Sequence, residues 1–216
     1  MGMLYEIIRI PDEVRKELLR EPYGIYKLLD IEPQPEMPPL PQKKNFFRKL
    51  KTLFTKQAET PPGQQKPEKE FSELIRNVTI APADALQLDK TWHILHYLMG
   101  NGDEYQDLAF PRGFLLFPEA ESVGDIDIGY GPAELYSPDQ VRRIADFTDS
   151  LDPAEMKRRL NPAELSEAEI YPAIWNSSDL DLESMWNDIY GNYFLPMKAF
   201  LHETAERNLA ILEIIE

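Results

Sequence analysis

Proline placement constrains this chain more than any other feature of its sequence. Proline lacks a backbone N–H and fixes φ, so it is excluded from the middle of helices and of central strands. Two short stretches, 33–41 and 61–67, together hold eight of the 19 prolines. We therefore interpret residues 33–70 as a Pro-rich insertion that lies outside the packed core.

Three other prolines mark the starts of helices. The segments 137–140, 152–155 and 161–164 each have a capping side chain, a proline directly after it, and Gln or Glu three residues after the cap. Proline is tolerated at the first helical position, and the Gln or Glu can return a hydrogen bond to the cap. The pattern predicts three helix N-termini.

Apolar patterns predict the remaining elements. Residues 4–10 and 209–215 are rich in branched apolar side chains and predict a first and a last strand, which could pair and close the domain. Residues 113–117 predict a strand or a buried extended segment. Residues 12–30 predict two helical pieces, and residues 179–206 a long helix with a kink at its proline.

These elements predict the fold class. We expect an α+β protein in which several helices pack on a small mixed sheet. Its 216 residues fit a single compact domain over 1–216, interrupted by the insertion at 33–70.

Residues 88–100 predict a helix that carries two of the chain's three histidines. His93 and His96 lie three residues apart and would share a helix face. Two such imidazoles could bind zinc if His202, Asp103, Glu104 or Asp107 joined them. The apolar stripe formed by Leu88, Trp92, Leu95 and Met99 favours a core helix instead, with one histidine hydrogen-bonded at the core edge and the other exposed. We therefore predict no metal and no cofactor.

Other catalytic patterns are weak. Asp125, Asp127, Glu134 and Glu169 lie beside apolar segments, where paired carboxylates could act as acid and base. With 38 acidic residues in the chain, such pairs arise by chance, so a solvated surface is favoured. The phosphate-loop and serine-hydrolase motifs are absent from the sequence, and residues 129–132 predict a structural turn.

Charge bounds the class of partner. The net charge of −15 disfavours nucleic acid and would attract a basic protein partner.

The sequence has no cysteine, which excludes disulfides and thiolate chemistry. The start lacks the features of a signal peptide, and no apolar run is long enough to span a bilayer, so we expect a cytoplasmic protein. The sequence leaves the oligomeric state open.

Residues 43–56 have the opposite charge. They hold six of the 23 basic residues and none of the acidic ones, with apolar residues at helical spacing, which predicts a short basic amphipathic helix. The helix could fold back on the acidic body, bind a partner, or contact an anionic membrane. The first alternative, or simple disorder of the segment, is favoured because neither needs a partner.

Several segments resemble, in order, the YfbM-like family of bacterial proteins of unknown function: 88–98, 130–133, 136–138, 169–172 and 205–208. The resemblance covers about 1–30 and 80–216, and 33–70 looks like a variable insertion. It implies a compact α+β domain of the bacterial cytosol. It supplies no catalytic or binding residues.

Two functional hypotheses remain. The first is a non-catalytic binding protein, which could neutralise a basic partner. The second is an enzyme with a site around His93, His96, Tyr130 and Tyr171. These four residues are the candidate binding residues, and no catalytic residue is predicted. The acidic surface and the lack of a complete catalytic motif favour the first hypothesis.

Overall fold

The computed structural model describes residues 2–32, 72–100, 108–177 and 180–216. The predicted insertion at 33–70, with the basic helix predicted at 43–56, lies entirely outside the described residues.

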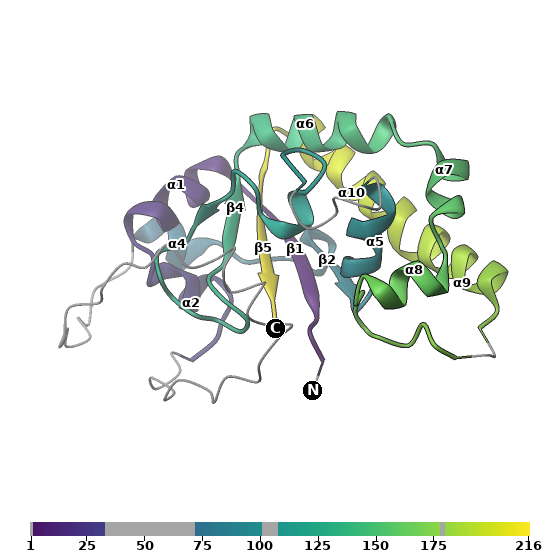
Figure 1. Ribbon diagram of the computed structural model, residues 1–216. Coiled ribbons are helices and arrows are strands. Elements are labelled where there is room, and N and C mark those ends of the chain that lie inside the picture. Colours follow the sequence, from purple (N-terminus) through teal and green to yellow (C-terminus); the bar gives the residue numbers. More distant parts are fainter. Residues whose placement is uncertain (1, 33–71, 101–107, 178–179) are drawn as a thin grey trace.

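A five-stranded sheet organises the described chain, with the strand order β2-β1-β5-β4-β3 (Figure 1). Its strands are β1 (Tyr5–Ile10), β2 (Ala85–Asp89), β3 (Glu121–Ser122), β4 (Glu134–Tyr136) and β5 (Ala210–Ile215). The first and last strands pair along their whole length, from Tyr5 opposite Ile215 to Ile10 opposite Ala210. This pairing confirms the expected closure of the domain by the two ends of the chain.

The α+β class is confirmed, but the sheet is not mixed. Every pairing among the described strands is antiparallel. Apolar patterning reveals where strands lie, whereas strand direction depends on where the long connections cross, which the pattern does not encode.

Helices cover both faces of the sheet (Figure 1). A smaller core lies under α1 (Asp12–Arg20), α2 (Gly24–Leu28) and α4 (Glu73–Asn77). The larger core lies on the other face, and its helices are α5 (Trp92–Met99), α6 (Pro138–Asp149), α7 (Pro153–Arg158), α8 (Pro162–Glu167), α9 (Leu182–Asp188) and α10 (Leu195–Glu206). No helix in the described ranges combines the length and the apolarity needed to cross a membrane.

Strand alternation assigns side chains to these two cores. Along β5, Ile211 and Ile215 belong to the larger core, whereas Leu212 and Ile214 belong to the smaller one. Glu213 lies between Leu212 and Ile214 in this alternation, so its side chain projects to the same face as those of Ile211 and Ile215. A carboxylate is therefore directed into the larger core.

The three predicted helix starts are confirmed. Ser137 forms a full capping box with Gln140 at the start of α6. The Asp152 carboxylate accepts from the Ala154 N–H at 2.9 Å. The Asn161 side chain caps α8 in the same way.

The long helix predicted at 179–206 is divided. A π-helical segment at Ile189–Phe194 joins α9 to α10, and Pro196 lies in the first turn of α10. Proline is tolerated in a first turn because it has no N–H to donate. The π-helical turn that precedes it interrupts the regular α-helical hydrogen bonds at this point.

Two local predictions are wrong. The helix expected over 88–100 begins only at Trp92, because Leu88 belongs to β2, and all eight residues of α5 are buried. The helix is therefore enclosed on every side and has no single apolar stripe. The strand expected at 113–117 is a 3-10 helix, Phe114–Leu116, because the Tyr136 hydroxyl hydrogen-bonds to the carbonyls of Phe114 and Pro118 and draws them together.

Candidate functional site

The predicted histidine pair is deeply buried in α5. His93 is 4% exposed and His96 is fully buried. The Tyr171 backbone N–H donates to His93 Nδ1 at 3.0 Å, and the Tyr171 hydroxyl accepts from the Met3 N–H at 3.1 Å. The His93–Tyr171 contact thus joins α5 to the segment before α9 and to the start of the chain.

The His93 contact needs a neutral imidazole. Burial, with a smaller effect of His96, lowers the pKa of His93 to about 3. Because Nδ1 accepts a hydrogen bond, the ring proton resides on Nε2. The expectation of one hydrogen-bonded histidine holds for His93, whereas the expectation that the other is exposed is wrong for His96, since the tight enclosure of α5 leaves it no solvent-facing side.

The alternative zinc site lacks its other ligands in the described part of the chain. No group of three or more His, Asp or Glu side chains in the described residues could hold a metal ion. His202 lies on α10, where its Nε2 is 3.0 Å from an Asp149 carboxylate oxygen. Asp103, Glu104 and Asp107 lie outside the described residues.

Tyr130 is held in the tight turn that the sequence predicted. Its backbone N–H donates to the Ile215 carbonyl at 2.9 Å, which ties the turn to the end of β5. One Asp127 carboxylate oxygen accepts from the N–H groups of Gly129 and Gly131, at 3.1 and 3.2 Å. Gly131 has φ +144°, a conformation that favours glycine. The turn therefore presents Tyr130, which is 42% exposed, from a fixed backbone.

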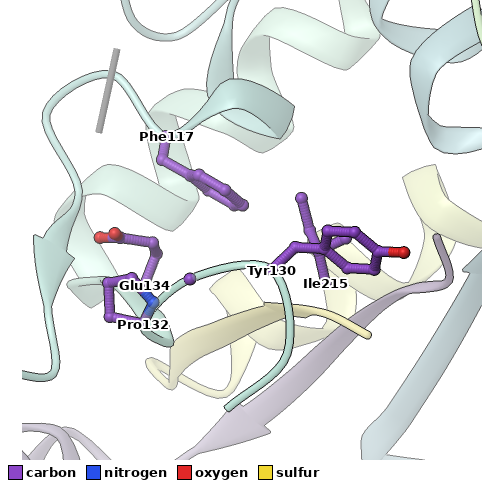
Figure 2. A pocket seen from close by; sticks show the side chains of 6 residues that line it. Phe117, Tyr130, Pro132, Glu134 and Ile215 are labelled. Carbon is purple, nitrogen blue, oxygen red and sulfur yellow. The ribbon is translucent and has the colours of Figure 1, made fainter. Parts of the chain in front are cut away.

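A hollow lies beside Tyr130 (Figure 2). Its volume is about 230 Å³ including the part open to solvent, and its closed part has room for about one water molecule. Figure 2 shows the Phe117 ring over the hollow, opposite Pro132, with the Glu134 carboxylate at the end away from Tyr130. The lining residues are Phe117, Tyr130, Gly131, Pro132, Glu134 and Ile215.

Glu134 is one of two buried carboxylates that lie side by side on the same face of the sheet. It lies directly opposite Glu213 in the β4–β5 register. Glu134 is 4% exposed and Glu213 is fully buried. The Ser122 hydroxyl, on the edge strand β3, lies 2.8 and 2.9 Å from the two oxygens of Glu134. The expected solvated role of Glu134 is therefore wrong, because β3 and the Phe117 segment cover it.

Burial controls the protonation of this pair. It raises the pKa of Glu134 to about 7, against a smaller lowering by the Ser122 hydrogen bond. Burial also raises the pKa of Glu213 well above its usual value, although the Tyr5 hydroxyl donates to Glu213 Oε2 at 2.8 Å. The negative charge of Glu134 raises the pKa of Glu213 further. Burial thus favours the neutral form of Glu213, and Glu134 can gain or lose a proton near pH 7.

Aromatic packing fixes the wall of the hollow. Tyr5 stacks on Phe117 with ring centroids 5.8 Å apart, and on Trp92 at 5.6 Å. Phe117 has a left-handed backbone with φ 64°, which is strained for a residue with a side chain. The bonds from Tyr136 to the neighbouring carbonyls hold this conformation.

The surface around the hollow is acidic. Residues 113–141 contain six Asp or Glu and no Lys or Arg. Glu121 and Asp139 form ion pairs with Arg15 and Arg142, Glu119 lies 3.7 Å from Arg143, and Glu134 is buried, so Asp125 and Asp127 carry the exposed charge. Tyr130 therefore projects from a surface with a local excess of negative charge.

Of the predicted site residues, the structure brings His93 and Tyr171 into direct contact and places His96 one turn further along α5. Tyr130 lies in a separate turn beside Glu134. Whether the four act together stays a prediction. Glu213 was missed, because a single Glu in a terminal apolar strand carries no sign of burial.

Comparisons with known proteins place the chain in a family. Residues 1–214 match a domain of unknown function, DUF1877. A solved structure described as a protein of unknown function, YfbM from Escherichia coli, is similar, with a TM-score of 0.59, 17% sequence identity and 99% of each chain covered. At this identity the likeness shows the fold. No curated protein matches the chain. The chain belongs to the DUF1877 family, and the predicted YfbM-like resemblance is confirmed.

Proposed function

We propose that this member of the DUF1877 family is a non-catalytic binding protein of the cytosol, and that it binds a basic protein. We assign the contact to the Tyr130 surface, defined as Phe117, Tyr130, Pro132 and the exposed Asp125 and Asp127. The observation that carries the proposal is Tyr130 itself, an exposed aromatic residue presented by a hydrogen-bonded turn within an acidic segment.

The fixed turn favours binding. Tyrosine is enriched among the residues that dominate binding energy, because its ring offers a large contact area at a small cost in side-chain entropy. The bond from the Tyr130 N–H to Ile215, and those from Gly129 and Gly131 to Asp127, hold the backbone before any partner arrives. Such pre-organisation reduces the entropy lost on association.

The local charge selects the partner. The exposed carboxylates of Asp125 and Asp127 create a local negative potential that accelerates encounter with a basic surface and disfavours an acidic one. Exposed carboxylates such as Asp125 would form the polar rim around the Tyr130 anchor.

The size of the hollow supports binding rather than catalysis. An enzyme pocket must enclose a substrate beside its acid or base. The closed part of this hollow has room for about one water molecule, and Glu213 behind it is fully buried. Two carboxyl groups with raised pKa values are therefore present without space for a substrate between them.

A fluorescent decapeptide of eight lysines and two leucines is a suitable probe. Its affinity is measured by fluorescence anisotropy at about 150 mM salt, where charges farther apart than about 8 Å are screened. We expect Tyr130→Ala to weaken binding about tenfold, the effect of losing an interface anchor. Leu195→Ala is the matched control, because Leu195 is 44% exposed, close to the 42% of Tyr130, and lies at the start of α10, directly after the π-helical segment that follows α9; it should leave the affinity unchanged.

Two results would contradict the proposal. Equal affinities of the wild type, Tyr130→Ala and Leu195→Ala would place the contact outside the Tyr130 surface. Binding seen only below about 20 mM salt, with no dependence on Tyr130, would identify a general attraction between opposite net charges.

A further inference from the structure

We infer that the hollow beside Tyr130 seats the ammonium group of a partner's lysine side chain, with Glu134 as its acceptor, and that it discriminates against arginine. The inference rests on the proposed function, because the lysine would belong to the basic partner that binds the Tyr130 surface. It adds the chemical identity of the group that is recognised.

The walls of the hollow suit an alkyl chain that ends in a cation. The Phe117 ring and Pro132 form opposite walls (Figure 2). A Cβ built on Gly131 would meet nothing within 4 Å, so the space above the turn is open. A lysine stem could lie in this space against apolar atoms, and the face of an aromatic ring attracts a nearby ammonium.

Among the described residues that line the hollow, Glu134 alone carries a carboxylate, and it lies at the end away from Tyr130 (Figure 2). A cation that enters beside Tyr130 and passes under Phe117 would therefore reach the Glu134 carboxylate at the far end of the hollow. A second charge on Glu213, directly opposite on β5, is disfavoured because burial raises the pKa of its carboxyl. The hollow thus presents a single negative charge to a single positive one.

Size favours an ammonium over a guanidinium. The closed part of the hollow admits a group about as large as one water molecule. An ammonium is a compact point charge of that size, whereas a guanidinium is a planar group with three nitrogens. Arginine would have to widen the hollow against Phe117, whose position is fixed by stacking on Tyr5.

The Ser122 hydroxyl provides a second, independent reason for the preference for lysine over arginine. Its hydroxyl lies 2.8 and 2.9 Å from the two oxygens of Glu134, so it occupies the edge of the carboxylate that both oxygens share. Arginine forms its strongest carboxylate contact by donating two parallel hydrogen bonds to that edge. Lysine needs only one oxygen, and the outer lone pairs of Glu134 stay available to it.

The test compares two peptides of equal charge. The lysine decapeptide described above is titrated in parallel with an analogue in which every lysine is arginine. We expect wild-type protein to bind the lysine peptide about fivefold more tightly, the scale of one charge-assisted hydrogen bond. Glu134→Gln should weaken binding of the lysine peptide and remove the preference. Glu206→Gln, an exposed glutamate of α10, controls for loss of one charge and should change neither.

Ser122 variants test the selectivity mechanism. Ser122→Ala should bring the two affinities together by freeing the shared edge of Glu134 for arginine. Ser122→Thr keeps the hydroxyl and should keep the preference for lysine. Each variant is first checked for wild-type circular dichroism and urea midpoint, and the threonine variant keeps the test decisive if the alanine variant is poorly folded.

The outcomes separate the two proposals. If neither peptide binds, the proposed function fails and this inference fails with it. If both bind equally through Tyr130, the proposed function stands and the lysine seat is refuted. If Ser122→Ala keeps the full preference for lysine, the blocking role of Ser122 is refuted.

Discussion

Replacing Glu134 by glutamine should make the protein more stable at alkaline pH. Burial raises the pKa of Glu134 in the folded protein to about 7, against 4.5 for an ordinary glutamate. The unfolded chain therefore loses this proton at lower pH than the folded protein does. The stability linked to Glu134 is fully present below pH 4.5, is lost as pH rises toward about 7, and stays lost above that pH. Glutamine does not ionise and avoids the loss.

The size of the effect follows from the two pKa values. The difference between 4.5 and about 7 corresponds to about 3 kcal/mol, at roughly 1.4 kcal/mol for each tenfold change in proton affinity. Glu134→Gln should therefore gain about 3 kcal/mol relative to wild type between about pH 4.5 and pH 8. Removing the charge of Glu134 also lowers the pKa of Glu213, which adds to the gain in the same direction. The glutamine oxygen can still accept the Ser122 hydrogen bond.

Urea unfolding followed by tryptophan fluorescence measures this difference, because Trp92, Trp175 and Trp186 are all buried. The free energy of unfolding is determined at half-unit steps from about pH 4.5 to pH 8.5 for wild type, Glu134→Gln and the exposed control Glu206→Gln. The control should run parallel to wild type. If Glu134→Gln also runs parallel to wild type within about 0.5 kcal/mol, Glu134 titrates as an ordinary surface glutamate and the reasoning is refuted.

Three further predictions concern two buried residues of the larger core and the cap of a helix that covers it. Tyr5→Phe leaves Glu213 Oε2 without its hydrogen bond, so the free energy of unfolding at about pH 5 should fall by about 1–3 kcal/mol, and an unchanged urea midpoint would contradict this contact. The His93 imidazole should keep the chemical shifts of the neutral ring in NMR spectra from about pH 5 to pH 8, because its pKa is about 3, and a midpoint near the ordinary value would contradict the burial of His93. Ser137→Ala removes the capping box of α6 and should cost about 1 kcal/mol in urea unfolding, whereas a loss near zero would show that the cap contributes nothing.

Local chemistry made much of the fold predictable. The cap-and-proline pattern at Ser137, Asp152 and Asn161 determines helix starts through hydrogen bonds within a few residues, so neighbouring sequence suffices. The 3-10 helix at Phe114–Leu116 was predicted as extended because the Tyr136 bonds that shape it come from residues about 20 positions away. Contacts across such distances leave no periodic mark on the sequence.

The candidate site was predictable only in part. Tyr130 and its turn could be predicted because glycine and proline mark tight backbone features locally. The pairing of Glu134 with Glu213 depends on the antiparallel register of β4 and β5, which join segments far apart in the chain. Moving that register by one residue would send Glu134 to the opposite face of the sheet. The buried pair is therefore a property of the tertiary structure.

The energetics of Glu134 connect its burial to the proposed lysine seat. Its ionisation removes about 3 kcal/mol of stability at alkaline pH, a substantial share of the roughly 5–15 kcal/mol that stabilises a typical domain. The pKa of about 7 already includes the Ser122 hydrogen bond, which lowers it less than burial raises it, so local structure alone does not offset the loss. A partner's ammonium at Glu134 would stabilise the ionised form and so recover free energy in the complex that the free protein lacks. Glu134→Gln should therefore stabilise the free protein and weaken the complex together, and a variant that gains stability without losing affinity for the lysine peptide would separate the two effects.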